Sequence, residues 1–331
     1  MMKKNDKTTY ILLAVFLLLI AGYFLSKYAK TLGNVLAEKK AGIASEEQTS
    51  DETSDDTDLQ DYPFEVVFLD VGQGDCTMIR CGDHYMLIDA GTMDYASKVR
   101  ELLNSYGVRH LDAIIATHDH ADHIGGMSGA IRAMITTDHL YCSMERSDEE
   151  AFDSFVYKAA LEGLKIEVPA MGDTFTLGEA EVVFMGPSDA LQDDPNSNNR
   201  SLVIKVTYKE TSVLITGDAE VEELDELVRS GQDLSADILK VGHHGSSNGI
   251  TEVFFGLVHP KYAVISCGKD NDYGHPHRKT LSVLGLGLVE LYRTDLQGTV
   301  IMVSDGNTIE FRTEQEAELA DLWTKGKYDP E

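Results

Sequence analysis

The sequence predicts an α/β fold in which two β-sheets pack face to face between outer layers of helices. Two successive runs of strand-like segments predict the two sheets, and amphipathic helical segments within each run predict the outer layers. A chain of 331 residues with 43% hydrophobic and 25% charged residues can bury a substantial core of this kind. We expect the folded domain to occupy residues 63–313.

The first run contains short segments in which apolar and β-branched residues dominate or alternate, as they do in strands. One helix is expected to stop at Gly107, a usual helix terminus, because apolar residues recur before it at helical spacing. The expected strands are 64–69, 76–80, 85–88 and 113–116, and the expected helices are 95–106, 124–135 and 149–164.

The second run repeats this layout and ends in a closing hairpin. The expected strands are 174–177, 180–185, 201–208, 212–216, 238–241 and 262–266, with helices at 221–230, around Phe254 and Phe255, and at 280–286. The hairpin pairs 299–303 with 308–312. We expect residues 314–331 to form a last helix over 314–322 and a frayed polar end.

The sequence pattern of the N-terminus predicts a membrane segment. Lysines at positions 3, 4 and 7 precede an apolar run over 10–25, which predicts a signal anchor in residues 1–28. The lysines predict a cytoplasmic N-terminus, so we expect a single-pass protein of the cell membrane with its folded domain outside the cytoplasm. A cleaved signal peptide and a secreted domain form the alternative. Residues 29–62 are expected to be a disordered acidic linker.

The net charge restricts how the protein could bind nucleic acid, and the spacing of the cysteines indicates their redox state. The formal net charge is −28, and the sequence has no basic stripe of the kind that binds nucleic-acid phosphates, which argues against tight DNA binding by a broad surface. The four cysteines form no Cys-x-x-Cys pair, and we expect buried thiols.

One short segment concentrates the chemistry. Residues 117–123 read Thr-His-Asp-His-Ala-Asp-His and directly follow the strand-like run 111–116. Neutral imidazole nitrogens and carboxylate oxygens are the ligands that hold zinc and similar divalent ions. We expect His118 and His120 to face one ion, and Asp122 and His123 to reach a second ion beside it.

This His-x-His-x-Asp-His pattern resembles the motif of the metallo-β-lactamase superfamily, and the chain most resembles the metallo-hydrolase domain of the ComEC/Rec2 DNA-uptake proteins. The multi-spanning channel segment of those proteins is absent from the sequence, so we expect a stand-alone module. The matching pieces occur in the family's order at 69–75, 87–91, 118–123, 198–202, 216–220, 239–246 and 273–276.

The resemblance implies an αββα sandwich and one or two divalent metal ions, zinc or manganese. It implies metal ligands at His118, His120, Asp122, His123 and Asp218, with His275 as the last ligand and His243 as the alternative. Many superfamily members have a further histidine ligand before the Thr-Gly-Asp aspartate, and this chain has none there. The first ion is therefore short of a nitrogen ligand, so manganese could compete with zinc.

Other residues receive supporting roles. By resemblance, Asp122 orients or deprotonates the attacking water, and His244 contacts the scissile phosphate or protonates the leaving group. Asp89 is expected to brace the metal loop, and Asp75 is either a substrate or supporting contact or a turn residue. Arg200 could hold a phosphate oxygen or pair with an acidic neighbour. Asn199 and Ser201 lie in the same expected segment.

The resemblance implies a metal-dependent hydrolase, and we expect a phosphodiesterase or nuclease that uses a metal-activated water. The substrate is then a phosphodiester, with DNA as a candidate. The alternatives are a small-molecule hydrolase that opens a lactone, lactam or thioester, and a metal-binding interaction domain without turnover. The sequence does not decide the oligomeric state.

Overall fold

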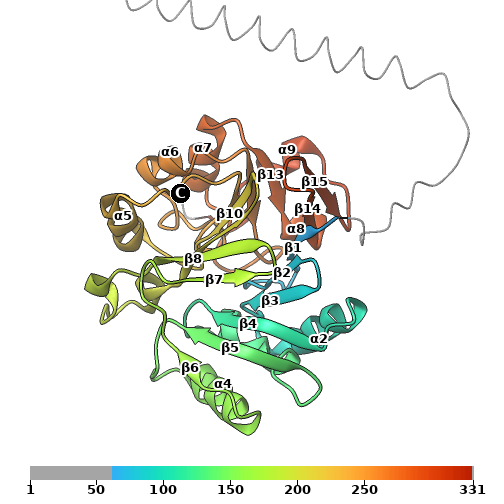
Figure 1. Ribbon diagram of the computed structural model, residues 1–331. Coiled ribbons are helices and arrows are strands. Elements are labelled where there is room, and N and C mark those ends of the chain that lie inside the picture. The colour runs from blue at the N-terminus through green and yellow to red at the C-terminus, as the bar shows by residue number, and fades with distance from the viewer. Residues whose placement is uncertain (1–61, 330–331) are drawn as a thin grey trace, which may run out of the picture. The chain divides into compact units, whose positions relative to one another are not determined.

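Two β-sheets form the centre of the computed structural model, which describes residues 62–329 (Figure 1). Within these residues the first sheet has eight strands in the order β15-β14-β1-β2-β3-β4-β5-β6. Its strands are β1 (Phe64–Phe68), β2 (Thr77–Cys81), β3 (His84–Ile88), β4 (His110–Ala116), β5 (Thr136–Cys142), β6 (Ile166–Glu167), β14 (Val300–Ser304) and β15 (Ile309–Thr313).

The second sheet has seven strands within the described residues, in the order β13-β12-β11-β10-β9-β8-β7. They are β7 (Thr174–Leu177), β8 (Ala180–Gly186), β9 (Val203–Tyr208), β10 (Thr211–Ile215), β11 (Ile238–Lys240), β12 (Tyr262–Ile265) and β13 (Glu290–Arg293). Strands β7 to β10 pair antiparallel, whereas β10 to β13 pair parallel.

The parallel strands place their carboxyl ends together, and this decides where the functional residues lie. In the first sheet β3, β4 and β5 run parallel, with Ile88 beside Ile115 and Ala116 beside Cys142. In the second sheet β10 and β11 run parallel, with Ile215 beside Lys240. Loops that follow such strands meet at one edge of a sheet, which is where α/β proteins usually bind ligands.

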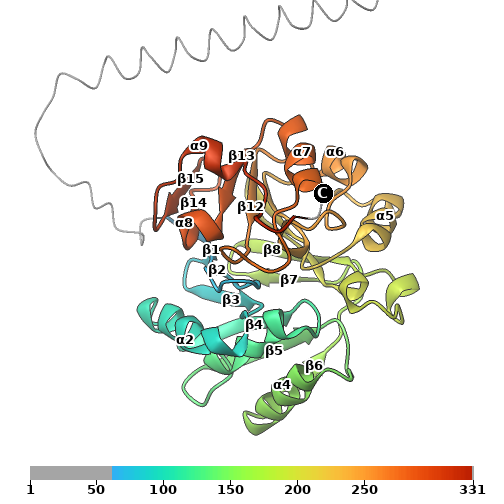
Figure 2. The ribbon, with the colours of Figure 1, turned by 180° about the vertical axis from the view of Figure 1, so that it is seen from behind.

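Three apolar clusters give the fold its four layers. The central cluster lies between the sheets, since it contains residues of both, such as Val66 and Val206. A second cluster packs the other face of the first sheet against α2 (Ala96–Ser105) and α4 (Glu150–Leu161). The third packs the second sheet against α5 (Val221–Ser230), α6 (Glu252–Val258) and α7 (Arg278–Leu286), as both ribbon views show (Figures 1 and 2).

The structure has the two sheets and outer helices that the sequence predicts. The segment 221–230 is a helix with the predicted bounds, and the four cysteines are buried and free as expected. The closing hairpin belongs to the first sheet, because β14 pairs antiparallel with β1. Strands β5, β6 and β13 and the short helix α8 (Thr294–Gln297) were not predicted. In β5 the residues Asp138 and His139 interrupt the apolar pattern and are exposed.

Two predicted helices are much shorter than expected. The helix predicted over 124–135 is instead α3 (Ala121–Ile124) followed by a 3₁₀ segment, Gly125–Gly129. A Cβ on Gly126 would lie 2.0 Å from the Ala90 carbonyl oxygen, so this segment is shaped by close backbone contact rather than by an amphipathic face. The helix predicted over 314–322 is formed only as α9 (Leu319–Leu322).

Up to Asp329, the polar end that was predicted to fray contacts the folded domain. Its Gly326 N–H donates to the Pro276 carbonyl, and the Arg278 N–H donates to the Asp329 carboxylate. The predicted membrane segment and almost all of the predicted linker lie outside the described residues. Among residues 62–329, none of the helices is long and apolar enough to cross a membrane.

Candidate metal centre

The predicted histidine loop follows β4 at the carboxyl edge of the first sheet and continues into α3, which carries Asp122 and His123. His118 and His123 are fully buried, and His120 is partly exposed. The Nε2 atom of His118 lies 3.1 Å from Nδ1 of His120. The ring centres of His118 and His123 are 4.2 Å apart, so the three imidazoles lie close together.

Asp89 fixes this loop from the end of β3. Its carboxylate accepts hydrogen bonds from the Thr117 N–H and hydroxyl at 2.8 and 2.7 Å. The same carboxylate lies 2.8 Å from Nδ1 of His123. If His123 donates its Nδ1 proton there, its Nε2 atom is left with a lone pair, and such a contact is typical of a metal-binding histidine. Asp89 has a φ of 56°, which is uncommon for a residue with a side chain.

The second sheet contributes Asp218, which follows β10. Gly217 allows a close approach here, since its φ is 51° and an added Cβ would lie 2.9 Å from Cβ of Thr117. The Asp218 N–H donates to the Ser201 hydroxyl at 3.1 Å. As a result Oδ1 of Asp218 lies 3.2 Å from Nε2 of His123, so the two sheets meet at this carboxylate.

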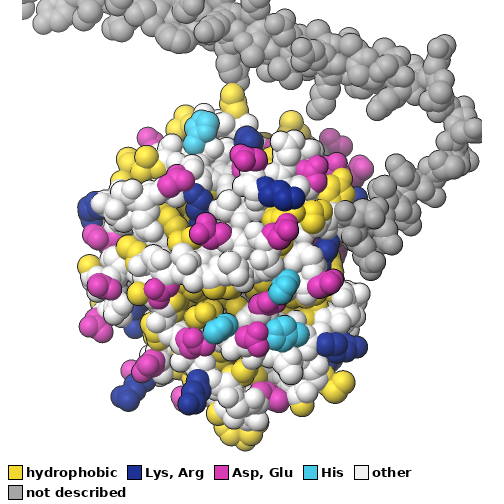
Figure 3. All heavy atoms as spheres, in the orientation of Figure 1, with side chains coloured by type: hydrophobic (Ala, Val, Ile, Leu, Met, Phe, Trp, Pro, Cys, Tyr) yellow, Lys and Arg dark blue, Asp and Glu magenta, His cyan; other side chains and the backbone are white. Residues whose placement is uncertain are grey.

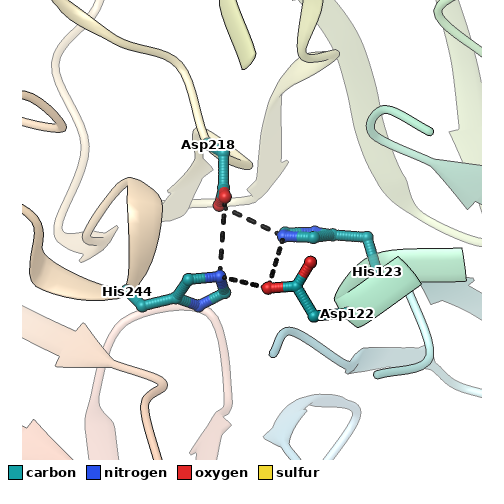
Figure 4. A group of neighbouring side chains, drawn as sticks. All are labelled: Asp122, His123, Asp218 and His244. Carbon is teal, nitrogen blue, oxygen red and sulfur yellow. Dashed lines mark hydrogen bonds and ion pairs between the residues drawn. The ribbon is translucent and has the colours of Figure 1, made fainter. Parts of the chain in front are cut away.

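Two groups of side chains converge on Asp218. Asp122, His123, Asp218 and His244 form the four-residue group, with ligand atoms all within 4.8 Å of one another (Figure 4). His118, His120 and Asp218 form the three-residue group by the same measure. Nε2 of His123 and Oδ1 of Asp218 are buried and, apart from their 3.2 Å approach to each other, have no hydrogen-bond partner. Buried polar atoms seldom lack partners, so this pair fits a divalent cation bound between them.

The charges of the centre also fit a cation. Burial would raise the pKa of the Asp218 carboxyl, but His244 and His123 outweigh it and hold that pKa well below its usual value. Burial, together with the neighbouring His123, lowers the pKa of His118 well below its usual value. Burial would lower the pKa of His123 and of His244, but the surrounding carboxylates, Asp218 first among them, outweigh it and raise the pKa of both imidazoles well above its usual value. The centre therefore has an excess of negative charge that either protons or a cation can balance, and a metal would bind its histidines in the neutral form.

The structure and the expected ligand set differ at one histidine. His244, rather than His275, completes the four-residue group: its Nε2 lies 3.1 Å from Oδ2 of Asp122 and 3.5 Å from Oδ2 of Asp218. The ring of His275 is 6.1 Å from that of His244, and its Nδ1 lies 3.3 Å from the Gln73 amide nitrogen.

His243, the alternative, lies at the rim of the centre. Its Nδ1 is 3.3 Å from a Glu220 carboxylate oxygen, while its Nε2 is 3.8 Å from Oδ2 of Asp218. Burial would lower the pKa of His243, but Glu220 and Asp218 raise it. His243 and His244 both have left-handed φ angles, 48° and 55°, so the turn after β11 holds adjacent imidazoles in different directions.

A buried ion pair behind His244 was not predicted. Lys240 on β11 donates to Asp75 at 2.7 Å, and both side chains are almost fully buried. The other oxygen of Asp75 lies 3.4 Å from Nδ1 of His244. Burial would raise the pKa of Asp75, but Lys240 and then His244 lower it to about 2. Lys240 ends the otherwise apolar strand Ile238–Lys240, and a lysine in such a buried segment indicates that an acidic partner is needed.

Of the remaining predicted residues, Ser201 contacts Asp218, Arg200 lies near His120, and Asn199 contacts neither. Ser201 contacts the Asp218 backbone, as described above. The Asn199 amide donates to Glu222 at 3.4 Å, away from both groups. Arg200 lines a cavity near His120 and makes no ion pair among the described residues. Ser197, which was not predicted, lies 3.0 Å from Nε2 of His120 through its hydroxyl.

Comparisons with known proteins agree with this geometry. A family model described as the metallo-beta-lactamase superfamily matches residues 69–269. ComE operon protein 3 from Bacillus subtilis (strain 168) is 33% identical over 71% of this chain and 32% of that protein. Competence protein ComA from Neisseria gonorrhoeae is 30% identical over 71% of this chain and 31% of that protein. Recombination protein 2 from Haemophilus influenzae is 27% identical over 72% of this chain and 28% of that protein.

The two-sheet scaffold, with imidazoles and carboxylates gathered at one edge, defines an α/β sandwich with a candidate metal centre. The chain belongs to the metallo-beta-lactamase superfamily and is ComEC/Rec2-like, which confirms the resemblance seen in its motifs. It spans about a third of the length of these curated relatives.

Proposed function

We propose that the protein is a metal-dependent phosphodiesterase that cleaves nucleic acid. The observation that carries this proposal is the shared carboxylate: Asp218 belongs to both the three-residue and the four-residue group. Two ions held on one carboxylate would be neighbours, and paired ions are typical of enzymes that hydrolyse phosphate esters. The names of the relatives, which refer to competence and recombination, support a substrate related to DNA.

In this proposal His118, His120 and Asp218 hold one ion, and Asp122, His123, Asp218 and His244 hold the other. When bound, such ions supply Lewis acidity and a water acidic enough to act as a nucleophile at neutral pH. Asp122 is the most exposed member of the four-residue group, with 31% of its side chain accessible. Its carboxylate can therefore orient a water in the centre and accept a proton from it.

A proton donor for the leaving oxygen is also present. With His244 assigned to the ions in place of His275, His243 is the imidazole that can supply this proton. Nδ1 of His243 lies 3.1 Å from the Asn248 side-chain oxygen and 3.3 Å from a Glu220 carboxylate oxygen, and its Nε2 lies 3.8 Å from Oδ2 of Asp218. A carboxylate on one ring nitrogen fixes the tautomer and orientation of an imidazole, as a general acid requires.

Because the surface is acidic, the substrate binds at a local site rather than over a broad surface. On the face drawn in Figure 3, lysine and arginine side chains are scattered among many carboxylates and form no patch. A polyanion would therefore be held by the centre and by groups directly beside it.

The test is hydrolysis by the full chain loaded with zinc or manganese. Single-stranded DNA, double-stranded DNA and bis(p-nitrophenyl) phosphate serve as substrates, beside a lactone and a thioester. We expect cleavage of the diesters, and loss of that cleavage in Asp122→Ala and His244→Ala. His139→Ala is the matched control, because His139 is exposed and pairs with Glu167 away from the centre. Cleavage of only the lactone or thioester, or of no substrate, would contradict the proposal.

A further inference from the structure

A cavity of about 410 Å³ opens beside the three-residue group. Two arginines, two serines and three carboxyl residues contribute to its lining. One of the serines, Ser197, contacts Nε2 of His120 through its hydroxyl at 3.0 Å. The cavity is therefore separated from a candidate metal ligand by a single side chain. Its volume lies within the range of about 300–1,000 Å³ that is usual for small-molecule sites.

Its two arginines have unused binding capacity. Within residues 62–329, neither Arg146 nor Arg200 makes an ion pair with a carboxylate. Nε of Arg200 is in addition buried without a hydrogen-bond partner. A guanidinium presents a planar fork of donors that matches the oxygens of a phosphate. Two such forks in one cavity form a site for a phosphate group.

The same cavity also contains an unused acceptor. Asp119 is 3% exposed, and its Oδ2 accepts a hydrogen bond from the Ser147 hydroxyl, but its Oδ1 is buried and has no partner. The other two carboxyl residues, Asp148 and Glu149, are exposed. A phosphodiester linkage alone has no donor for Asp119, and the carboxylates would repel it. A nucleotide carries both a phosphate and N–H or O–H donors, so it matches the whole lining.

We propose that this cavity binds the nucleotide next to the scissile bond of a polynucleotide strand. Arg146 and Arg200 bind its phosphate, and Oδ1 of Asp119 accepts a hydrogen bond from its base or sugar. The inference rests on the proposed phosphodiesterase function and extends it to a strand rather than an isolated diester. It also explains how a chain with a net charge of −28 could hold a polyanion at one place.

The test is binding of a short labelled single strand to the zinc-loaded full chain, measured by fluorescence anisotropy. Phosphorothioate linkages keep the charge and slow cleavage, so binding is measured separately from catalysis. We expect Arg146→Ala and Arg200→Ala each to weaken binding about tenfold, since each removes hydrogen bonds to a charged group. The slope of log affinity against log salt should fall by about 0.7, the value for one lost phosphate contact with a single strand.

Matched variants and strands sharpen this test. Arg100→Ala is the control, because Arg100 is exposed on α2 and donates to Ser97. Arg200→Lys keeps the charge without the fork, so an intermediate loss is expected if it folds as the wild type does. DNA and RNA strands of one sequence are compared: tighter RNA binding indicates that Asp119 accepts from the 2′-hydroxyl, and equal binding indicates the base.

The inference is overturned if both arginine variants bind the strand with the wild-type affinity and salt slope. It is also overturned if Arg100→Ala loses as much affinity as Arg146→Ala and Arg200→Ala do. Failure of the proposed function has a different signature. In that case the wild type cleaves neither an ordinary oligonucleotide nor bis(p-nitrophenyl) phosphate, whatever the result of the binding measurement.

Discussion

The four-residue group and the three-residue group share Asp218, but they differ in how their histidines are held. His123 and His244 are buried, and each is held from behind, by Asp89 and by the Ser266 carbonyl with Asp75. In the three-residue group His118 is also buried, with its Nδ1 3.1 Å from the Thr117 hydroxyl, but His120 is partly exposed and its Nε2 contacts the Ser197 hydroxyl. Supporting hydrogen bonds strengthen metal binding by fixing the ligands. We therefore expect a tightly bound ion in the four-residue group and a weaker, more exchangeable ion in the other.

Removal of the shared carboxylate should have the largest effect, because it affects both groups at once. We expect Asp218→Ala to abolish binding of both ions and to lower kcat/KM by about 10³-fold or more, since the ions supply several kcal/mol of transition-state stabilisation. Metal content per chain and diester hydrolysis are the measurements. If the variant retains two ions, Asp218 does not join the two groups.

The ion pair behind the four-residue group should show the next largest effect. Lys240→Met leaves the buried Asp75 carboxylate without its cation, which should reduce the free energy of unfolding by about 3–5 kcal/mol. We also expect weaker zinc binding, because Asp75 contacts His244. Chemical denaturation and chelator competition measure the two effects.

Arg80→Met is the control for that variant. Arg80 pairs with the buried Glu65 at 2.9 Å, in strands β1 and β2 of the first sheet. We expect it to lower stability while zinc affinity is retained. Equal zinc affinities in the two variants would show that the Lys240–Asp75 pair only stabilises the fold.

Zinc itself should stabilise the protein, and the four-residue group should contribute more of this stabilisation than the three-residue group. At a zinc concentration about 100 times the dissociation constant, we expect about 2.7 kcal/mol of added stability. His244→Ala should lose most of the corresponding rise in melting temperature, and His120→Ala should lose less. Differential scanning calorimetry with and without a chelator measures this. A larger loss in His120→Ala would reverse the expected order of the two groups.

Removal of one supporting contact should have the smallest effect. Asp89→Asn keeps the size of the side chain but weakens its hold on His123 and Thr117, so we expect zinc affinity to fall about 10- to 100-fold. Isothermal titration calorimetry can follow the tight ion alone. An unchanged affinity would mean that Asp89 acts only in the fold of the loop.

Much of this comparison could be predicted from the sequence because its signals are local. The spacing of His118, His120, Asp122 and His123 within one loop indicates a metal site without knowledge of the fold. Asp89 and Asp218 each follow a short apolar strand, so their position at a sheet edge could also be predicted. The two-sheet architecture follows from the strand pattern in the same way.

The rest depends on long-range contacts and backbone turns. Lys240 and Asp75 are 165 residues apart, and no local pattern pairs them. The position of His244 beside Asp122 and Asp218 depends on the left-handed turn at His243 and His244, which sequence spacing does not specify. The shortened helix after the histidine loop depends on the approach of Gly126 to the Ala90 backbone. Each of these features is decided by a partner distant in the sequence.

The most direct measurement is anomalous X-ray scattering from crystals of the zinc-loaded protein. We predict two neighbouring zinc peaks with Asp218 as a ligand of both, and with His244 rather than His275 on the ion beside His123. We also predict that the peak beside His120 is the weaker at limiting zinc. A single ion that does not contact Asp218, or peaks only at surface carboxylates, would contradict the shared metal centre.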